Sequence, residues 1–551
     1  MNRGQHAPFL PVFGVFIGLV WTVLACGQNT SLLTVRVTDE TGRLNPARAW
    51  VQVGDERLFQ PDSPAEATPY ARDRSFSFDG VFTMSLPAGQ AILHVEKGKE
   101  YLPVDISFEV KAGETMQKTV RLERWINMPV SGWYSADLHV HLGQDDPRIL
   151  TQLALADDVH LIPAFTYWLR GQGETWHADW PDESYTRPVK IDDRHIITRN
   201  NIEIERISRE SQPGGFIGAT FLYNLNQPVT AELNGEHFPT DARLCRVAQL
   251  HSPQVVLDSD KPSWSETVVG VALGAMDTIQ LCHNHFHRET SITGGWGMIG
   301  PLAAGESNAA AGDGLFHRTN SLYYRFLNCG FKLGVSGGSA IGVMPVPTGF
   351  HRVYAKIDGA FTADKYWQAI KAGRSFTTTG PMLFLNADGK GVGETISLSA
   401  PDSKSLRVAA TVRSIENLES LEIVHDGKVV AWTSLKGKDP TPVLEERLVF
   451  EIKPKRSGWV VARALFRAPD GLLRQAHTSP IYLSVDGKPT ASAEDARYML
   501  QWLDVLESIA RDNPDRFPTS RIRNEVLSDY QEARDRYLQI LEQSRETWGD
   551  R

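Results

Sequence analysis

The stretch Gly132–His141, which reads GWYSADLHVH, decides how the centre of this chain is interpreted. Its alternation of apolar and polar residues predicts a β-strand that ends in a loop. Because residues i and i+2 lie on the same face of a strand, His139 and His141 can both point into one pocket. This arrangement is typical of divalent metal sites, and the alternative is a pair of histidines that only form hydrogen bonds.

Strand-like runs alternate with segments of helical composition on both sides of this motif, over residues 129–381. That alternation predicts an α/β domain, in which several strands deliver side chains to one edge of a sheet or barrel. Short alternating strands and turns predict a β-sandwich for residues 31–125, similar to prealbumin-like modules, and a second one for residues 382–486. Residues 492–549 form a helical tail, which we expect to be an αα-hairpin that opens with a capping box at Ser492.

The first 26 residues have the pattern of a signal peptide, with Arg3 before an apolar run over Phe9–Ala25. Ala25 and Cys26 resemble a bacterial lipobox, so membrane attachment through a lipidated Cys26 and plain secretion both remain open. In either case we expect a periplasmic or extracellular protein. A formal net charge of -9 over 551 residues, without a basic stripe, argues against a nucleic-acid partner.

The segment NNIEIER places Glu203 and Glu205 on one face of a strand. A carboxylate shared with two histidines is a common set of ligands in hydrolytic metal sites. For either glutamate alone, a surface ladder with Arg206 and Arg209 is the favoured alternative.

Three histidines alternate in LCHNHFHRE, at positions 283, 285 and 287. We expect at least one of them to face the same site as His139 and His141, and His285 is the first candidate. A bend after Leu281 would separate the three side chains.

Two further segments contain candidate catalytic groups. Asp258 and Lys261 follow an apolar strand in VVLDSDKPSW, where a pocket rim and a solvated turn are equally compatible with the pattern. Arg374, in GRSFTTTGP, can hold an anionic oxygen. A domain-junction turn is the interpretation that we favour for this last segment.

Taken in order, GWYSADLHVH, NNIEIER, LDSDKPSW, LCHNH, the run from Tyr323 to Tyr354 and GRSFTTTGP resemble the CehA/McbA-type branch of the polymerase-and-histidinol-phosphatase (PHP) superfamily. The resemblance implies a distorted (β/α)7 barrel with metals at the C-terminal ends of its strands, and hydrolysis of phosphoester or other ester-like bonds. It also implies that His139 and His141 form the first metal motif, that Glu203 is the bridging carboxylate, and that His285 occupies the position of an Asn-Asn-His motif.

The chain departs from that superfamily at three motifs. Phe165–Trp168 replaces an Asp-His pair, Gly215–Phe216 replaces a Gly-His motif, and Ser336–Ser339 replaces the final Asp-x-His. The resemblance therefore implies one or two divalent ions (Zn, Mn or Fe) rather than three.

The resulting hypothesis is an exported metal-dependent hydrolase that cleaves a small-molecule or polymer-derived ester with a metal-activated water. Glu205 or Asp258 would take the proton of that water, and Lys261 or Arg374 would stabilise the developing negative charge. The alternatives are a non-catalytic exported binding protein for a glycan or cell-surface ligand, with a degenerate metal site, and a lipoprotein that uses metal only for stability.

Overall fold

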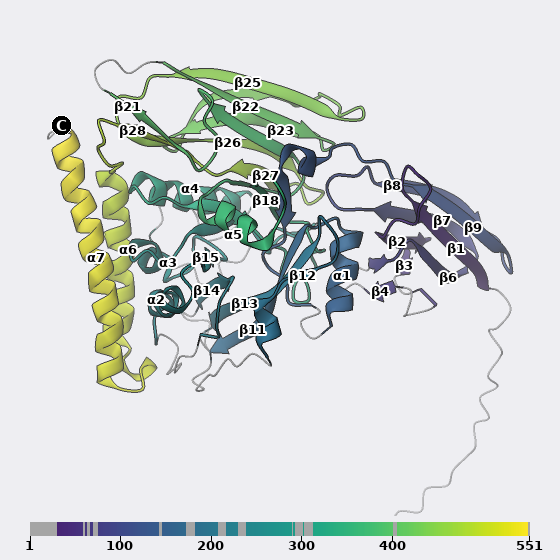
Figure 1. The fold of residues 1–551 in the computed structure, drawn as a ribbon, viewed down its shortest axis with the longest axis horizontal. Coiled ribbons are helices and arrows are strands. Elements are labelled where there is room, and N and C mark those ends of the chain that lie inside the picture. Colours follow the sequence, from purple (N-terminus) through teal and green to yellow (C-terminus); the bar gives the residue numbers. More distant parts are fainter. Residues whose placement is uncertain are drawn as a thin grey trace, which may run out of the picture.

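The computed structural model describes residues 30–58, 61–62, 67–69, 75–142, 146–171, 182–207, 216–229, 238–288, 290–292, 301, 312–399 and 405–548. The expected signal peptide and Cys26 lie outside the described residues. The chain is a mixed α/β protein that is richer in strands than in helices (Figure 1). Within the described ranges, no helix combines the length and the apolarity that crossing a bilayer requires.

The first part of the chain builds two sheets that enclose one core. One sheet has the order β6–β1–β9, and the other has the order β4–β5–β2–β7–β8 with β3 beside β2. Alternate side chains of β1, among them Leu33 and Val35, are fully buried between the sheets. The bounds are β1 (Thr30–Thr38), β2 (Ala47–Val53), β3 (Glu56–Leu58), β4 (Ala67–Pro69), β5 (Phe76–Phe78), β6 (Val81–Pro87), β7 (Gly89–Glu96), β8 (Val104–Val110) and β9 (Thr115–Arg121).

Seven strands of the central part form a run whose two ends meet. Their order is β17–β16–β15–β14–β13–β11–β10, and all neighbours are parallel except where β14 pairs with β13 and β15. The N–H of Leu138, just after β10, donates to the Gly337 carbonyl at 3.1 Å, and Val140 bridges to Ile341. The bounds are β10 (Trp133–Ala136), β11 (Leu161–Gly171), β12 (Val189–Lys190, beside β13), β13 (Ile196–Ile207), β14 (Phe216–Tyr223), β15 (Val256–Ser259), β16 (Thr278–Cys282) and β17 (Gly334–Gly337).

Helices connect several of these strands, and some of them begin at an N-cap residue whose side chain accepts a main-chain N–H. Asp146 accepts a hydrogen bond from the Arg148 N–H ahead of α1, and Thr240 caps α2 in the same way. The bounds are η1 (Met128–Ser131), α1 (Pro147–Ala156), η2 (Glu183–Thr186), α2 (Asp241–His251), α3 (Thr267–Ala272), α4 (Gly314–Asn328) and α5 (Ala363–Lys371).

The sheet continues from the central part into a C-terminal β-module. β18 pairs with β10, β19 pairs with β18, and β27 then pairs with β19, so one sheet spans both parts. A three-stranded sheet, β20–β22–β25, packs on the other side of a shared apolar core. The predicted hairpin turn at Asp426–Gly427 is confirmed, since both residues have positive φ between β23 and β24. The bounds are β18 (Arg352–Lys356), β19 (Ser375–Thr378), β20 (Met382–Ala387), β21 (Thr395–Leu398), β22 (Leu406–Ser414), β23 (Leu418–His425), β24 (Lys428–Ser434), β25 (Leu444–Ile452), β26 (Gly458–Arg467), β27 (Leu473–Thr478) and β28 (Ile481–Val485).

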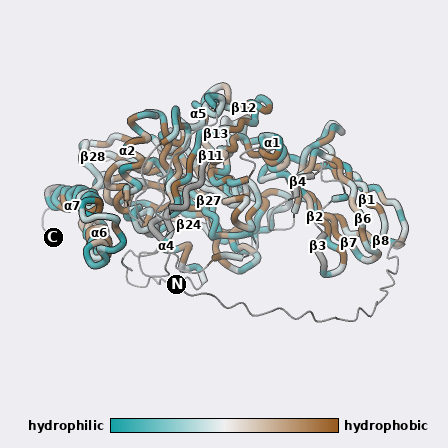
Figure 2. Tube along the Cα trace, turned by 90° about the horizontal axis from the view of Figure 1, so that it is seen from below, coloured by the Kyte–Doolittle hydropathy of each residue, from teal (hydrophilic) through white to brown (hydrophobic). Residues whose placement is uncertain are grey.

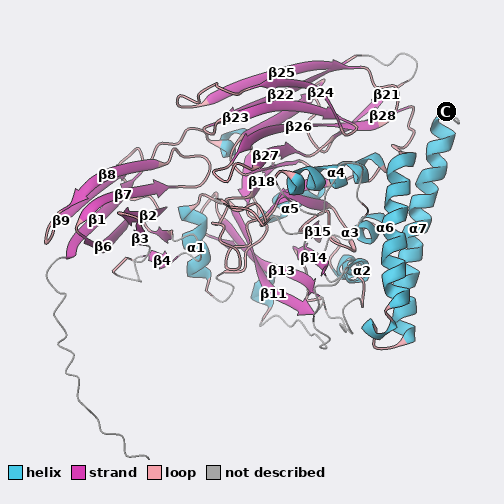
Figure 3. Cartoon of the chain, turned by 180° about the vertical axis from the view of Figure 1, so that it is seen from behind, coloured by secondary structure: helices cyan, strands magenta, loops and turns pink. Residues whose placement is uncertain are grey.

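Two helices, α6 (Ala493–Asp512) and α7 (Ser520–Trp548), follow the β-module and are joined through η3 (Pro514–Arg516). They lie side by side at the end of the molecule opposite the N-terminal sheets (Figure 3). Ser492 accepts a hydrogen bond from the Asp495 N–H, which confirms the predicted cap. Hydrophilic residues dominate the outer helix α7, whereas hydrophobic segments gather in the central part (Figure 2).

Candidate metal centre

The candidate site lies at the C-terminal ends of the parallel central strands. His139 and His141 follow β10, and the buried Asp137 fixes the backbone around them. One Asp137 oxygen accepts hydrogen bonds from the N–H groups of His139 (3.1 Å) and Ser339 (2.9 Å), and the other accepts from Gly349 (2.7 Å). This carboxylate therefore ties the histidine segment to the loop that follows β17.

The structure brings three of the four predicted ligands together: His139, His141 and Glu203 of β13 offer ligand atoms that lie within 4.8 Å of one another. The two Nε2 atoms are 2.9 Å apart, and Glu203 Oε2 lies 3.1 Å from His141 Nε2 and 3.6 Å from His139 Nε2. Ligands at the 2.0–2.2 Å bond lengths usual for Zn²⁺ lie roughly 3.0–3.5 Å apart. These three side chains therefore fit a divalent metal with little rearrangement.

Asp260, just after β15, lies on the other side of the His139 ring. Its Oδ1 is 3.6 Å from His139 Nδ1, while Oδ2 pairs with the Lys261 ammonium and lies 3.3 Å from Trp264 Nε1. A carboxylate next to the second ring nitrogen of a metal-binding histidine orients the ring and increases its basicity. In the sequence, Asp260 belongs to the segment VVLDSDKPSW, for which a pocket rim and a solvated turn were equally compatible.

Aromatic rings and a glycine complete the surroundings of the histidines. The Phe221 ring lies 4.6 Å from the His139 ring, and the Phe165 ring lies 5.4 Å from that of His141. Gly338 directly follows β17 and lies against His139. A Cβ at this position would lie 2.4 Å from the His139 Cβ. Only a residue without a side chain fits there, a constraint that the Gly337–Gly338 pair hinted at in the sequence.

Burial and nearby carboxylates shift the protonation of this group. Burial opposes charge on His139, but the carboxylates of Glu203 and Asp260 outweigh it and raise its pKa to about 10. Burial also raises the pKa of Glu203 to about 7. For Asp260, burial is outweighed by Lys261 and His139, which hold its pKa well below the ordinary value. The two carboxylates thus favour positive charge at the His139 ring, which lies between them.

The fourth predicted ligand, His285, is buried but does not belong to the three-residue group. Burial, and next the charge of Lys261, keep its pKa well below the usual value, with Asp260 and His139 also acting on it. The chain turns after β16, where the Phe286 N–H donates to the His283 carbonyl. The three alternating histidines therefore do not share one strand face. A bend near Leu281 was the arrangement expected to separate them, and β16 ends one residue later, at Cys282.

The predicted catalytic groups lie in different settings. Glu205 is half-buried on β13, and its charge helps to raise the pKa of Glu203. Lys261 is buried, paired with Asp260 and stacked over the Trp264 ring at 4.8 Å. Both therefore lie beside the ligands.

Asp258 is held by three donors. The hydroxyl groups of Thr278 (2.8 Å) and Ser336 (2.6 Å) donate to Oδ1, and the Gln280 amide (2.9 Å) donates to Oδ2. Burial raises its pKa to about 6. This carboxylate links β15, β16 and β17, and its oxygens are already engaged.

The structure does not bring Arg374 to the site. The Arg374 carbonyl accepts from the Lys356 N–H, and Lys356 pairs with Trp133 at the start of β10. Arg374 therefore lies level with the beginning of that strand, whereas His139 follows its end. Its guanidinium lies 3.4 Å from Asp358 Oδ2. This placement agrees with the junction-turn interpretation favoured from the sequence.

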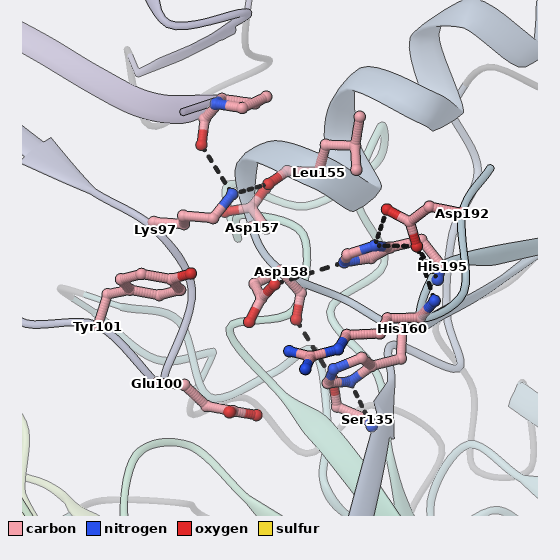
Figure 4. A network of polar contacts seen from close by, with 12 residues as sticks. Lys97, Glu100, Tyr101, Ser135, Leu155, Asp157, Asp158, His160, Asp192 and His195 are labelled. Carbon is pink, nitrogen blue, oxygen red and sulfur yellow. Dashed lines mark hydrogen bonds and ion pairs between the residues drawn. The ribbon is translucent and has the colours of Figure 1, made fainter. Parts of the chain in front are cut away.

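A second group, Glu100, Asp158 and His160, also places carboxylates and an imidazole within metal-binding distance (Figure 4). Here Arg124 already supplies the positive charge, donating to Glu100 at 2.8 Å and pairing with Asp158 at 2.9 Å. His160 Nδ1 accepts the Ser135 N–H at 2.9 Å, and burial lowers its pKa to about 3. We interpret this network as a fastening between the N-terminal sandwich and the central part, which the sequence did not predict because its members are widely separated.

Neither the protein-family models nor the curated proteins that were compared with the chain show a match.

Proposed function

We propose that this protein is an exported, metal-dependent hydrolase of ester-type bonds, built on a barrel of the PHP type that resembles its CehA/McbA branch. The observation that carries the proposal is the convergence of His139, His141 and Glu203 at the C-terminal ends of the strands. Support for the barrel comes from the seven-strand run whose ends meet at Leu138 and Gly337.

A divalent metal held by these residues would lower the pKa of water to near neutrality, about 7, and polarise the ester oxygen. Glu203 and the two histidines bind the ion, and Asp260 holds the His139 ring in position. Glu205, on the same strand face as Glu203, is the group best placed to accept a proton. Lys261 offers positive charge for the oxygen that becomes anionic.

Turnover of reporter substrates tests this function. Purified mature protein is assayed with p-nitrophenyl phosphate, bis(p-nitrophenyl) phosphate and p-nitrophenyl acetate, before and after chelation and with Zn²⁺, Mn²⁺ or Fe²⁺ restored. We expect chelation to abolish turnover and one of the metals to restore it. Turnover that persists after chelation, or in His139→Ala, contradicts the proposal.

The second candidate is a binding protein that has lost catalysis. Ser336 lies within the segment where the superfamily carries its final Asp-x-His, and its hydroxyl group is bonded to Asp258. A ligand position has thus become part of a hydrogen-bond network. Stoichiometric metal without turnover of any ester reporter would favour this candidate.

The expected export depends on the pattern of residues 1–26 and is part of the proposal. N-terminal sequencing and mass spectrometry of the mature chain test it, because lipidation would make a modified Cys26 the first residue. An intact Met1 in protein from the native cell envelope would contradict cleavage of a signal peptide, and recovery of the protein from the cytoplasm alone would contradict export.

A further inference from the structure

A cavity of about 290 Å³ lies where the N-terminal sandwich, the loops of the central part and the C-terminal β-module meet. Lys99 and Tyr101 line it from the sandwich, Phe350 and Arg352 from the central part, and Glu416 from the β-module. His139, His141 and Glu203 do not line this cavity, so it is distinct from the candidate metal centre.

The cavity wall is rich in positive charge. Four of its arginines have carboxylate partners. Arg288 binds both oxygens of Glu96 at 2.7 and 2.8 Å, and Arg474 donates to Asp470 at 2.9 Å. Arg48 pairs with Glu96 and Asp157, and Arg467 pairs with Asp313 and Glu419. Arg352 instead donates to main-chain carbonyl groups, at 2.7 Å for Gly349 and 3.0 Å for Asp157. Its buried charge is therefore satisfied by dipoles, and no carboxylate of the described residues forms an ion pair with it.

Among the described cations that line this cavity, Lys99 is the second one that forms no ion pair. Its ammonium lies 4.4 Å from the centre of the Phe350 ring. Burial lowers its pKa to about 7, the Glu416 carboxylate opposes this change, and Arg352 and Arg288 reinforce it. A positive charge in this cavity beside two guanidinium groups is costly, and a bound anion offsets that cost.

We infer that this junction cavity binds a small molecule or ion that carries a phosphate or sulfate group, with Lys99 as its direct contact and Arg352 as a source of buried positive charge. The volume lies near the lower limit of small-molecule sites, about 300 Å³, which suits a free ion or a compact ester rather than a polymer. Because three parts of the chain form the walls, the bound anion also links them. The inference goes beyond the proposed hydrolysis and does not depend on it.

Calorimetric titration of the full mature chain tests the inference, with metal removed and ionic strength held constant. Inorganic phosphate, inorganic sulfate and glycerol 3-phosphate are the probes. If a free ion binds more tightly than the ester, the natural ligand is a free ion, and if the ester binds more tightly, it is a small ester. We expect saturable binding that Lys99→Met weakens at least about tenfold. Lys118→Met is the matched control, because Lys118 lies 4.7 Å from the Phe108 ring of the same sandwich but outside the cavity.

Two further variants separate binding from stability and from the metal centre. Glu416→Gln removes a carboxylate of the cavity wall, so it should tighten phosphate binding by about threefold, a gain that a structural defect does not produce. His139→Ala should leave phosphate binding unchanged. Absence of saturable binding, equal losses in Lys99→Met and Lys118→Met, no gain in Glu416→Gln, or loss of binding in His139→Ala would each overturn the inference. If Lys99→Met does not fold, the phosphate binding of Glu416→Gln and His139→Ala tests the inference instead.

Discussion

His139 lies between two carboxylates: its Nε2 is 3.6 Å from Glu203, and its Nδ1 is 3.6 Å from Asp260. The two ring nitrogens thus have different roles. Nε2 points towards the other predicted ligands, and Nδ1 points towards Asp260, a carboxylate that can orient the ring. Because Asp260 is itself paired with the buried Lys261, the position of the imidazole depends on a chain of contacts from β15.

Removing a ligand should remove the metal. We expect His139→Ala to lose the stoichiometric Zn, Mn or Fe of the wild type, measured by elemental analysis of purified protein. His251→Ala is the control, because His251 is exposed at the end of α2. His285→Ala tests the fourth predicted ligand, and we expect it to keep its metal, because His285 lies outside the three-residue group. Full metal content in His139→Ala would contradict the metal centre, whereas full content in His285→Ala would restrict it to three ligands.

Asp260→Asn should weaken metal binding without removing a ligand. Loss of an orienting carboxylate typically costs about 10–100-fold in metal affinity, measured by competition with a chromophoric chelator. Asp258→Asn, two residues away, should keep an affinity close to that of the wild type, because Asp258 is bonded to Thr278, Gln280 and Ser336 instead. Equal losses in the two variants would show that Asp260 has no specific orienting role.

Gly338→Ala should displace His139. The added Cβ would lie 2.4 Å from the His139 Cβ and 2.8 Å from its main-chain nitrogen, so the backbone must shift. We expect a loss of about 1–3 kcal/mol in the free energy of unfolding, together with weaker metal binding. Gly391→Ala is the control, because its nearest neighbour is a Glu394 oxygen at 3.6 Å. Unchanged metal binding in Gly338→Ala would contradict this account.

Asp258 should make the stability of the metal-free protein depend on pH. Burial raises its folded-state pKa to about 6, above the ordinary value of 3.8, so between these values the native state binds more protons than the unfolded state. This stabilisation is fully present below pH 3.8 and is lost as the pH rises through 6. The span is on the order of 3 kcal/mol.

Comparison of wild type and Asp258→Asn by urea unfolding at several pH values isolates this contribution. The free energy of unfolding of the variant should rise relative to that of the wild type between pH 4 and 7, because the neutral amide does not titrate. A difference that stays constant across this range would refute the assignment.

Arg124→Met should loosen the N-terminal sandwich. It leaves the carboxylates of Glu100 and Asp158 buried without their shared partner, which typically costs about 3–5 kcal/mol. Arg148→Met, which breaks only an exposed pair with Asp146, should cost less than about 1 kcal/mol. Thermal unfolding and limited proteolysis near residue 124 measure both effects. Similar stability of the two variants would contradict a fastening role for the network.

Local sequence patterns were sufficient to predict many of the strands and turns. Alternation predicted β1, β2, β6, β7 and β9 of the N-terminal sandwich, but not the other four strands. The Asp426–Gly427 pair predicted a hairpin because positive φ suits those two residues. The pairing of His139 with His141 followed from the same period of two. These features depend on neighbours within a few residues, which the sequence displays directly.

Tertiary structure decided the rest. Glu203 joins the two histidines because β11 lies between β10 and β13, and Asp260 joins them from a strand that no spacing rule connects to β10. Arg374 lies away from the site because β19 enters the sheet at the level where β10 begins. The cavity at Lys99 exists only where three parts of the chain meet. Strand order, register and packing between distant segments depend on the whole chain, so the sequence alone named candidate residues but not which of them converge.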